Sequence, residues 1–349
     1  MRWGYASAFA AMVALTASVP GFSNVAAAQT GKLEKPNVTL LIGGVSGQMY
    51  FLPVVLAERL GYFKEAGLQL NKIDTGSGAK ALQALIGGSA DVAAGSFEHP
   101  IRMNARGRPI RAFVKFGRFH GNVLGIVTHR MKDYKTPADM KGWKIGISAP
   151  GSSSHLFAGL LLQKYGLKNE DVSFVAVTQG PGAVAAVRTG KELDAVALTD
   201  PVITELASTN DITVVADSRN LEGTKEVYGG ETISGVLYTT ADFLKQNPNT
   251  AQAMTNAVVR ALKWMKTASV DDIAAKVPDF QAGKPDLYKA MVEKNITSFH
   301  HDGTFAPEAV QVTLDFLRKT DAEMKDAKVD LSKTYDNTFA EKAKTQVAK

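Results

Sequence analysis

The sequence predicts an α/β protein built from two similar lobes, and three observations carry this prediction. Apolar runs of strand length alternate with helical patterns from residue 38 to residue 239. The connections between them are short and contain glycine, as in βαβ units that form a mostly parallel sheet. The alternation runs through once and then restarts with no change of composition, and 349 residues are enough for two domains of common size.

The first unit begins with the apolar run VTLLI at 38–42, which is typical of a buried strand. The helical pattern that follows it ends at Gly61, because glycine commonly closes a helix. We predict these elements in the first unit: strands at 38–42, 68–73, 91–94 and 110–116, and helices at 51–60, 79–86 and 100–105.

The second unit repeats this pattern from another apolar run. Its longest helix has Leu156, Leu160 and Leu161 on one side and ends at Gly166. We predict these elements in the second unit: strands at 123–128, 144–147, 172–177, 195–198 and 214–216, and helices that begin at 136 and cover 154–165, 183–189 and 201–206.

The C-terminal part is predicted to be helical after a last strand at 236–239. Residues 250–266 repeat apolar side chains at helical spacing, and Ser269 with Asp272 resembles a capping box. Pro307 stands near the start of the last long helix, where its missing N–H does no harm. We expect these helices to cover the faces of the sheets.

Two crossings between the lobes are expected, at 128–132 and at 228–235. Lobe 1 then comprises 29–128 together with 235–349, and lobe 2 comprises 129–234. Ligands of open α/β sheets lie beyond the carboxyl ends of the strands. The loops that follow each strand are therefore where a binding site is expected.

Residues 1–28 have the pattern of an export signal that is cleaved after Ala28. Arg2 supplies a positive start, residues 6–19 are apolar, and Ala26-Ala27-Ala28 forms a small-residue cleavage site. The apolar run is shorter than the roughly 20 residues that span a bilayer, and no later stretch is long enough. We expect a periplasmic protein.

The chain has no cysteine, which excludes a lipid-anchored cysteine, disulfides and thiolate metal sites. The formal net charge is +6, and removal of Arg2 with the signal leaves 39 − 34 = +5. Basic and acidic residues are interspersed, so we expect no nucleic-acid partner, although an acidic ligand is compatible with this charge. His300 and His301 are adjacent and point apart, so no metal and no cofactor are predicted.

Several post-strand loops offer polar groups to a ligand. Ser77 lies in TGSGAKA at 75–81, a G-x-G-x-x-A turn that lacks the downstream acid of a dinucleotide site and the Ser or Thr of a P-loop. In the loop at 96–98, Ser96 can donate a hydrogen bond, Phe97 can stack on a planar ligand and Glu98 can accept from an amine. The alternative for this loop is the cap of a helix start.

Two further loops carry a charge. Arg118 follows the strand at 110–116 and is the best-placed cation for a ligand anion, unless it is a solvated surface residue. Thr199 and Asp200 follow the strand at 195–198, where Asp200 is expected first as a helix cap and second as a ligand contact.

Three consecutive serines stand in APGSSSH at 149–155. A serine nucleophile needs a base, and His155 is adjacent in sequence and therefore points in another direction from the serines. No G-x-S-x-G elbow occurs. Ser152, Ser153 and Ser154 are therefore predicted as the ligand rim of the second lobe, with Ser152 or Ser153 as helix cap, and no catalytic residue is predicted.

Several segments together resemble the nitrate/sulfonate/taurine type of periplasmic solute-binding protein. They are GYFKEAGL at 61–68, ALQALIGGSADV at 81–92, KGWKIGIS at 141–148, and LDA at 193–195 with the Asp200-Pro201 pair. The resemblance covers nearly all of the chain after the signal. It implies a type II periplasmic binding fold, in which two α/β lobes joined by two crossovers close on a solute in the cleft between them.

By this resemblance the protein is not an enzyme but the binding component of an ABC importer, a monomer that delivers its solute to a permease in the inner membrane. It implies these cleft residues: Ser46, Gln48, Ser77, Ser96, Phe97, Glu98, Ser152, Ser153, Ser154, Thr199 and Asp200. We expect a small organic anion such as a sulfonate, taurine, nitrate or a carboxylate.

Three alternatives stay open. The first is a neutral or amine-bearing ring, such as a thiamine-precursor pyrimidine stacked on Phe97 near Glu98. The second is an enzyme on the same fold, although the pyrimidine-synthesising member carries a Cys-rich motif that this chain lacks. The third is a sensory protein that reports ligand occupancy to a membrane receptor.

Overall fold

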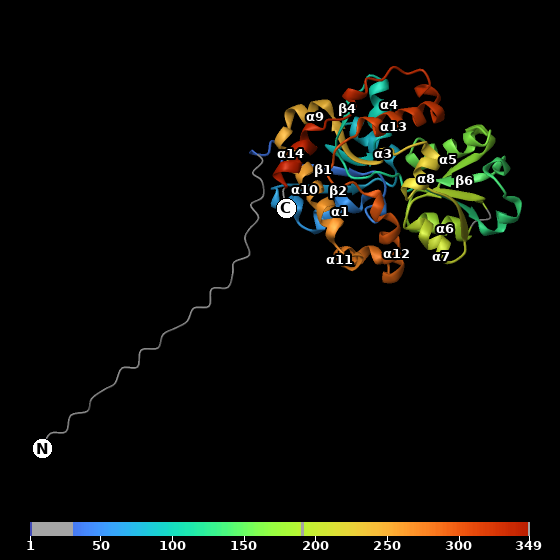
Figure 1. Ribbon diagram of the computed structural model, residues 1–349, viewed down its shortest axis with the longest axis horizontal. Coiled ribbons are helices and arrows are strands. Elements are labelled where there is room, and N and C mark those ends of the chain that lie inside the picture. The colour runs from blue at the N-terminus through green and yellow to red at the C-terminus, as the bar shows by residue number, and fades with distance from the viewer. Residues whose placement is uncertain (2–30, 190–191, 348–349) are drawn as a thin grey trace.

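The structure is a computed structural model that describes Met1, residues 31–189 and residues 192–347. The predicted export signal and its cleavage after Ala28 lie outside these residues. The two lobes of the described part lie side by side, as Figure 1 shows.

The first lobe is built on a five-stranded sheet in the order β2-β1-β3-β10-β4. Its strands are β1 (Asn37–Ile42), β2 (Gln69–Asp74), β3 (Val92–Ser96), β4 (Ile110–Lys115) and β10 (Gly235–Thr240). β1 pairs in parallel with β2 and β3, with Leu40 opposite Lys72 and Val92. β10 runs antiparallel to both of its neighbours.

The second lobe repeats this arrangement in the order β7-β6-β8-β5-β9. Its strands are β5 (Val123–Val127), β6 (Lys144–Ile147), β7 (Ser173–Ala176), β8 (Ala195–Leu198) and β9 (Ile212–Asp217). β5 is the antiparallel strand here, between β8 and β9. The predicted pair of similar, mostly parallel α/β lobes is therefore confirmed.

The first crossing between the lobes lies earlier than predicted. β5 pairs with two strands of the second sheet, so the chain changes lobe at 116–122 and not at 128–132. Because β5 is an apolar strand buried along its whole length, its sequence fits either sheet and does not show which one it joins. The second crossing, at 229–234 between α8 and β10, lies where it was predicted.

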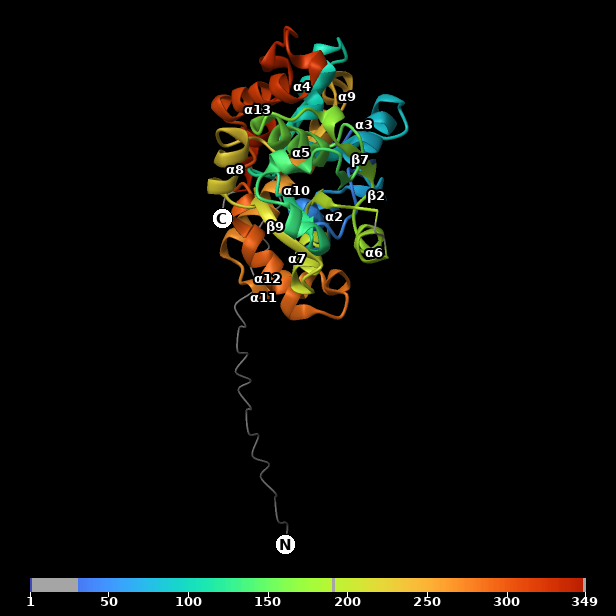
Figure 2. The same ribbon diagram turned by 90° about the vertical axis from the view of Figure 1, so that its right-hand side faces the viewer.

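Helices cover both faces of both sheets (Figures 1 and 2). Those of the first half are α1 (Leu52–Arg59), α2 (Tyr62–Glu65), α3 (Gly78–Ile86), α4 (Glu98–Ala105), α5 (Ser153–Lys164), α6 (Pro181–Thr189) and α7 (Val202–Ser208). Those of the second half are α8 (Leu221–Tyr228), α9 (Ala241–Gln246), α10 (Pro248–Thr267), α11 (Val270–Lys276), α12 (Pro285–Asn295), α13 (Pro307–Thr320) and α14 (Thr338–Gln346).

Helix α10 shows how the C-terminal segments complete the first lobe. Its 20 residues begin with a proline, and one side is fully buried against α1 and α14 over one face of the first sheet. The carboxylate of Glu34 accepts hydrogen bonds from the first N–H groups, those of Asn249 and Thr250, at 3.1 and 3.0 Å. The prediction that these helices cover sheet faces is confirmed.

A buried ion pair of the second lobe is bonded to the first lobe through Asn295. Asp200, which follows β8, accepts hydrogen bonds from the guanidinium of Arg219 at 3.0 Å and from the side-chain amide of Asn295 in the first lobe at 2.8 Å. Its other oxygen accepts from the backbone N–H of Thr204 at 2.9 Å, which is the predicted capping role. Arg219 also binds Asp217, so each buried charge has a partner.

We predict that Asp200→Ala lowers the free energy of unfolding by about 2–4 kcal/mol, because Asn295 loses its buried acceptor and Arg219 keeps only the partly exposed Asp217 as a partner. Urea unfolding followed by circular dichroism measures this change. The matched control is Asp279→Ala, since Asp279 is 49% exposed in its ion pair with Arg59 and is worth about 0.5 kcal/mol or less. Equal effects of the two substitutions would contradict the prediction.

Candidate functional site

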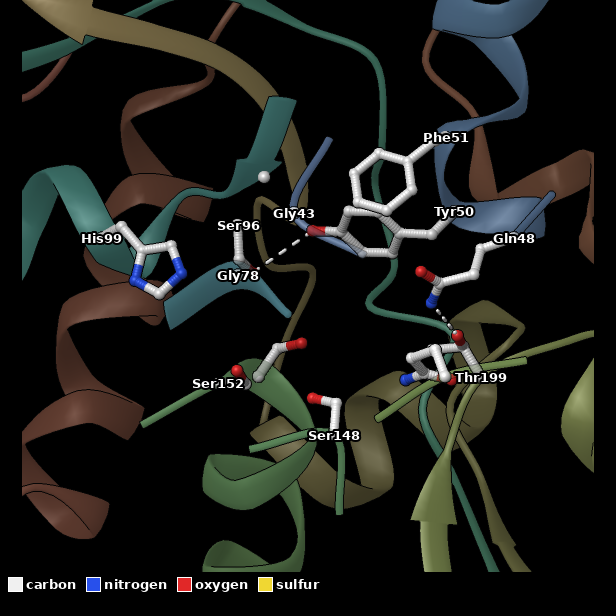
Figure 3. A pocket seen from close by; sticks show the side chains of 13 residues that line it. Gly43, Gln48, Tyr50, Phe51, Gly78, Ser96, His99, Ser148, Ser152 and Thr199 are labelled. Carbon is white, nitrogen blue, oxygen red and sulfur yellow. Dashed lines mark hydrogen bonds between the residues drawn. The ribbon is translucent and has the colours of Figure 1, made fainter. Parts of the chain in front are cut away.

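A small polar cavity lies between the two lobes, at the carboxyl ends of strands from both sheets (Figure 3). Its volume is about 30 Å³. Residues that follow β1, β3, β6, β7 and β8 line it, which is where ligands of open α/β sheets bind. The lining residues are Gly43, Gln48, Tyr50, Phe51, Gly78, Gly95, Ser96, His99, Ser148, Ser152, Ser153, Gln179 and Thr199.

Five of the predicted site residues line this cavity: Gln48, Ser96, Ser152, Ser153 and Thr199. The first two come from lobe 1 and the other three from lobe 2. The Nε2 atom of Gln48 donates a hydrogen bond to the Thr199 hydroxyl at 2.9 Å, and this bond crosses from one lobe to the other. The predicted cleft rims are therefore brought together from segments that are far apart in the sequence.

Four predicted polar residues lie near the cavity but use their side chains elsewhere. Ser46 is bonded to the carboxylate of Asp74 through its N–H and its hydroxyl. Ser77 caps α3 by accepting from the N–H of Lys80. Ser154 binds Ser148 within lobe 2, with 2.8 Å between the hydroxyl oxygens, and Asp200 is held in its buried ion pair.

The predicted roles of Phe97 and Arg118 are wrong for this structure. Phe97 is fully buried in the core, where its ring lies 5.5 Å from that of Phe305, so it does not face a ligand. The Nε and Nη2 atoms of Arg118 donate hydrogen bonds to the two carboxylate oxygens of Glu231, each at 3.0 Å. The guanidinium is therefore paired with Glu231 and does not line the cavity. A single sequence does not show either partner, because both partners lie more than 100 residues along the chain.

The sequence reasoning missed the glycines and aromatic residues of the cavity. A Cβ atom on Gly78 would lie 2.9 Å from Nε2 of His99, and one on Gly43 would lie 2.9 Å from the carbonyl oxygen of Ala94. The missing side chains let β1, α3 and α4 approach closely at this point. Tyr50 and Gln179 carried no recognisable signal, since neither belongs to a motif.

The N-termini of two helices meet at the cavity. α3 contributes Gly78 from its first turn, and α5 contributes Ser152 at its cap position and Ser153 in its first turn. The Ser152 hydroxyl does not cap its own helix but accepts from the N–H of Ala79 at 3.4 Å across the cleft. Free N–H groups and the positive ends of two helix dipoles favour a negative charge at this place.

Glu98 lies directly behind the cavity wall, buried at 0% exposure. The Ser96 hydroxyl donates to one carboxylate oxygen and accepts from the Tyr50 hydroxyl at 3.2 Å. The other carboxylate oxygen has no hydrogen-bond partner within the described residues. Burial raises the pKa of Glu98 to about 7, against the smaller opposing effects of Ser96 and Arg102.

His99 brings an imidazole rather than a cation to the cavity. Burial lowers its pKa to about 3, so the ring is neutral at physiological pH. Neither ring nitrogen has a hydrogen-bond partner among residues 31–189 and 192–347, and the same holds for Oε1 of Gln179. Of the lining residues that the structure describes, none carries a formal charge at neutral pH, and the cavity walls offer hydroxyl, amide, imidazole and N–H groups.

In the part of the chain that the structure describes, no cluster of His, Asp or Glu side chains could hold a metal ion. Among the helices of that same part, none is both long enough and apolar enough to cross a membrane.

Comparison with known families identifies the chain. The family model described as NMT1/THI5 like matches residues 48–268. This chain belongs to the NMT1/THI5-like family. A protein of known structure from Bordetella bronchiseptica RB50 is 42% identical to it, with a TM-score of 0.88 over 91% of this chain and 100% of that one.

More distantly similar proteins of known structure have names that state what they bind. The alkanesulfonate-binding protein SsuA of Xanthomonas axonopodis pv. citri, bound to MOPS, is 16% identical, with a TM-score of 0.68 over 87% of this chain and 99% of that one. The periplasmic nitrate-binding protein NrtA of Synechocystis PCC 6803 is 14% identical, with a TM-score of 0.68 over 90% and 89%. With these neighbours, the two sheets have the predicted type II periplasmic binding protein fold, and the predicted resemblance is confirmed.

We predict that Glu98→Gln changes how stability depends on pH. The pKa of Glu98 rises from 4.5 to about 7 on folding, so its protonated form stabilises the fold below about pH 4.5 and this contribution is lost as the pH rises through 7. Between pH 5 and pH 8 the wild type should lose about 3 kcal/mol more than Glu98→Gln.

Urea midpoints at the two pH values measure the difference, and all other titrating groups are shared by both proteins. Glu226→Gln is the control, since the Glu226 side chain is 68% exposed. Parallel pH profiles for the wild type and Glu98→Gln would contradict the assigned pKa.

Proposed function

We propose that this protein is the periplasmic substrate-binding component of an ABC importer and captures a small organic anion between its lobes. The observation that carries the proposal is the lining of the cavity by donor groups and two helix N-termini, without a carboxylate among the described lining residues. The family match, and solved neighbours that bind an alkanesulfonate and nitrate, support it. Sulfonate, taurine, nitrate and carboxylate remain the proposed solute class.

The hydrogen-bond donors of the cavity can supply the free energy of binding that such a role needs. Micromolar binding needs about −8 kcal/mol. A helix N-terminus contributes about 0.3–1 kcal/mol toward a negative charge, and up to about 2 kcal/mol when partly buried. Hydrogen bonds to a charged group contribute about 1.5–3 kcal/mol each, and Ser152, Ser153 and Gln179 lie at the cavity to make them. Exclusion of water between the lobes strengthens each contact.

Capture by hinge closure follows from the same geometry. The bond between Gln48 and Thr199 and the bond from Arg102 to the carbonyl oxygen of Gly151, at 3.1 Å, both cross from lobe to lobe. A solute can reach the cavity only when such contacts open. The two connections at 116–122 and 229–234 supply the hinge between otherwise separate sheets.

The site supports binding rather than catalysis. Nδ1 of His155 accepts from the N–H of Gly151 at 3.1 Å, so this imidazole is not paired with a serine hydroxyl. Ser96 is bonded to Glu98, but no imidazole links the two in the manner of a catalytic triad. An amine-bearing ring is less favoured than an anion, because Phe97 is turned into the core and Glu98 is protonated below pH 7.

The proposed partners are the small solute and a cognate permease in the inner membrane. We propose a monomer that is exported to the periplasm by cleavage after Ala28.

We predict that sulfonates or related oxyanions raise the melting temperature of the purified protein. A ligand present at 100 times its Kd stabilises by about 2.7 kcal/mol, which corresponds to several degrees for a protein of this size. A thermal-shift panel of methanesulfonate, taurine, nitrate, benzoate and a neutral pyrimidine measures this. The proposal of an anionic solute would be overturned if only the pyrimidine raised the melting temperature. It would also be overturned if none of the anions did.

We predict that the double substitution Ser152→Ala and Ser153→Ala weakens binding of the anion from that panel at least tenfold, about 1.4 kcal/mol. Both hydroxyls line the cavity, whereas the Ser154 hydroxyl binds Ser148 and its removal should lower stability more than affinity. Isothermal titration measures the affinity, with Ser89→Ala on the exposed surface as control. If the double variant bound the anion with unchanged affinity, neither serine would contribute to ligand binding.

A further inference from the structure

A second and larger cavity lies beside the polar one, also between the lobes, with a volume of about 230 Å³. Helices α6 and α7 of lobe 2 and α12 of lobe 1 surround it, and α7 and α12 are neighbours at the junction of the lobes (Figures 1 and 2). Its walls are largely apolar, with contributions from Val45, Pro181, Val184, Val202, Leu287 and Met291.

The same three loops line both cavities from opposite sides. Residues 43 and 48 face the polar cavity, while residues 45 and 47 between them face the apolar one. Gln179 and Thr199 line the polar cavity, whereas residues 180–181, directly after Gln179, and 201–202, just beyond Asp200, line the apolar one. The two cavities are therefore adjacent and share a wall.

Two contacts between the lobes lie in the loops that separate the cavities. The Gln48–Thr199 hydrogen bond is one of them. Val45 makes the other, with its Cγ2 atom 3.8 Å from where a Cβ on Gly180 would lie. Each pair has one member in each lobe, so the wall opens whenever the lobes separate. Lys284 and Glu205 pair at 3.3 Å, again from opposite lobes, at the rim of the apolar cavity.

The sizes of the two cavities show what kind of solute fits. The polar cavity, at about 30 Å³, is much smaller than its neighbour of about 230 Å³, so it has room for a small head group and not for an organic body. The neighbouring cavity is large enough for a ring or a short chain, and apolar walls favour burying one. Together they match the usual design of a ligand site, a few polar groups beside an apolar chamber.

We infer that the apolar cavity holds the hydrocarbon body of the solute, whose oxyanion head lies in the polar cavity. The solute is then an oxyanion that bears a ring or chain rather than a bare inorganic anion. Gln48 and Val45 reposition to let the two parts of the ligand join. This inference rests on the proposed function, since the head group is the anion proposed there.

The test compares methanesulfonate, which has a head and almost no body, with benzenesulfonate, which adds a ring. Isothermal titration on the wild type should give at least tenfold tighter binding of benzenesulfonate. Leu287→Trp fills the apolar cavity from its half-buried wall and should abolish most of this preference. Methanesulfonate should bind Leu287→Trp within about twofold of the wild type, because the polar cavity is untouched.

Leu331→Trp is the matched control, a half-buried leucine of lobe 1 that lines neither cavity, and it should leave both affinities unchanged. If Leu287→Trp does not fold by circular dichroism, Val184→Met narrows the same cavity with a smaller side chain. If the wild type binds the two sulfonates equally tightly, the inference is overturned and the proposed function still stands. The same holds if Leu287→Trp weakens the binding of both sulfonates by the same factor. If neither sulfonate binds and no other oxyanion does, the proposed function fails and the inference falls with it.

Discussion

Strand β10 pairs between β3 and β4 although the whole second lobe separates it from them in the chain, and the rest of the structure depends on this pairing. It returns the chain to the first sheet and so makes the second crossing obligatory. β5 does the reverse, since it leaves the first lobe and pairs between β8 and β9. Two sheets joined in this way present their carboxyl-end loops to one common space, which is why one cavity collects residues from both lobes.

The space between the lobes is held by contacts of quite different strength. Buried and ion-paired groups around Asp200 lie near the crossings, where the lobes stay joined. Single hydrogen bonds, such as the one between Gln48 and Thr199, join the lobes at the polar cavity. A fully satisfied buried network is costly to break, while one neutral hydrogen bond is worth about 1 kcal/mol. The contacts between the lobes are therefore strong around Asp200 and weaker at the lining of the cavity.

The electrostatics of the cavity come from dipoles and not from side-chain charges. Arg118, the obvious cation in the sequence, is neutralised by Glu231 away from the cavity, and burial keeps His99 neutral. What remains for an anion is the N-termini of α3 and α5 and a set of hydroxyl and amide groups. Glu98 adds a buried carboxyl whose charge appears only near pH 7, so the wall of the cavity on this side is neutral below that pH.

The alternation of strands and helices, the two lobes and the loops in which a site could form are all predictable from the amino-acid sequence. The period and the length of an apolar run are local properties of the sequence. For this reason the predicted strands at 144–147 and 195–198 have the same bounds as the observed strands β6 and β8. A capping box is likewise local, and Ser269 with Asp272 forms the one predicted at the start of α11. Ser77, predicted as a ligand contact, instead caps α3.

Long-range packing fixes which sheet β5 joins and which polar side chains reach the cavity. Ser152 and Ser154 are two residues apart in one helix start, yet one faces the other lobe and one faces Ser148. Phe97 and Arg118 are turned away by partners that come from Phe305 and Glu231. The orientation of a side chain depends on what packs against it, and those partners lie far along the chain, where a local pattern holds no information about them.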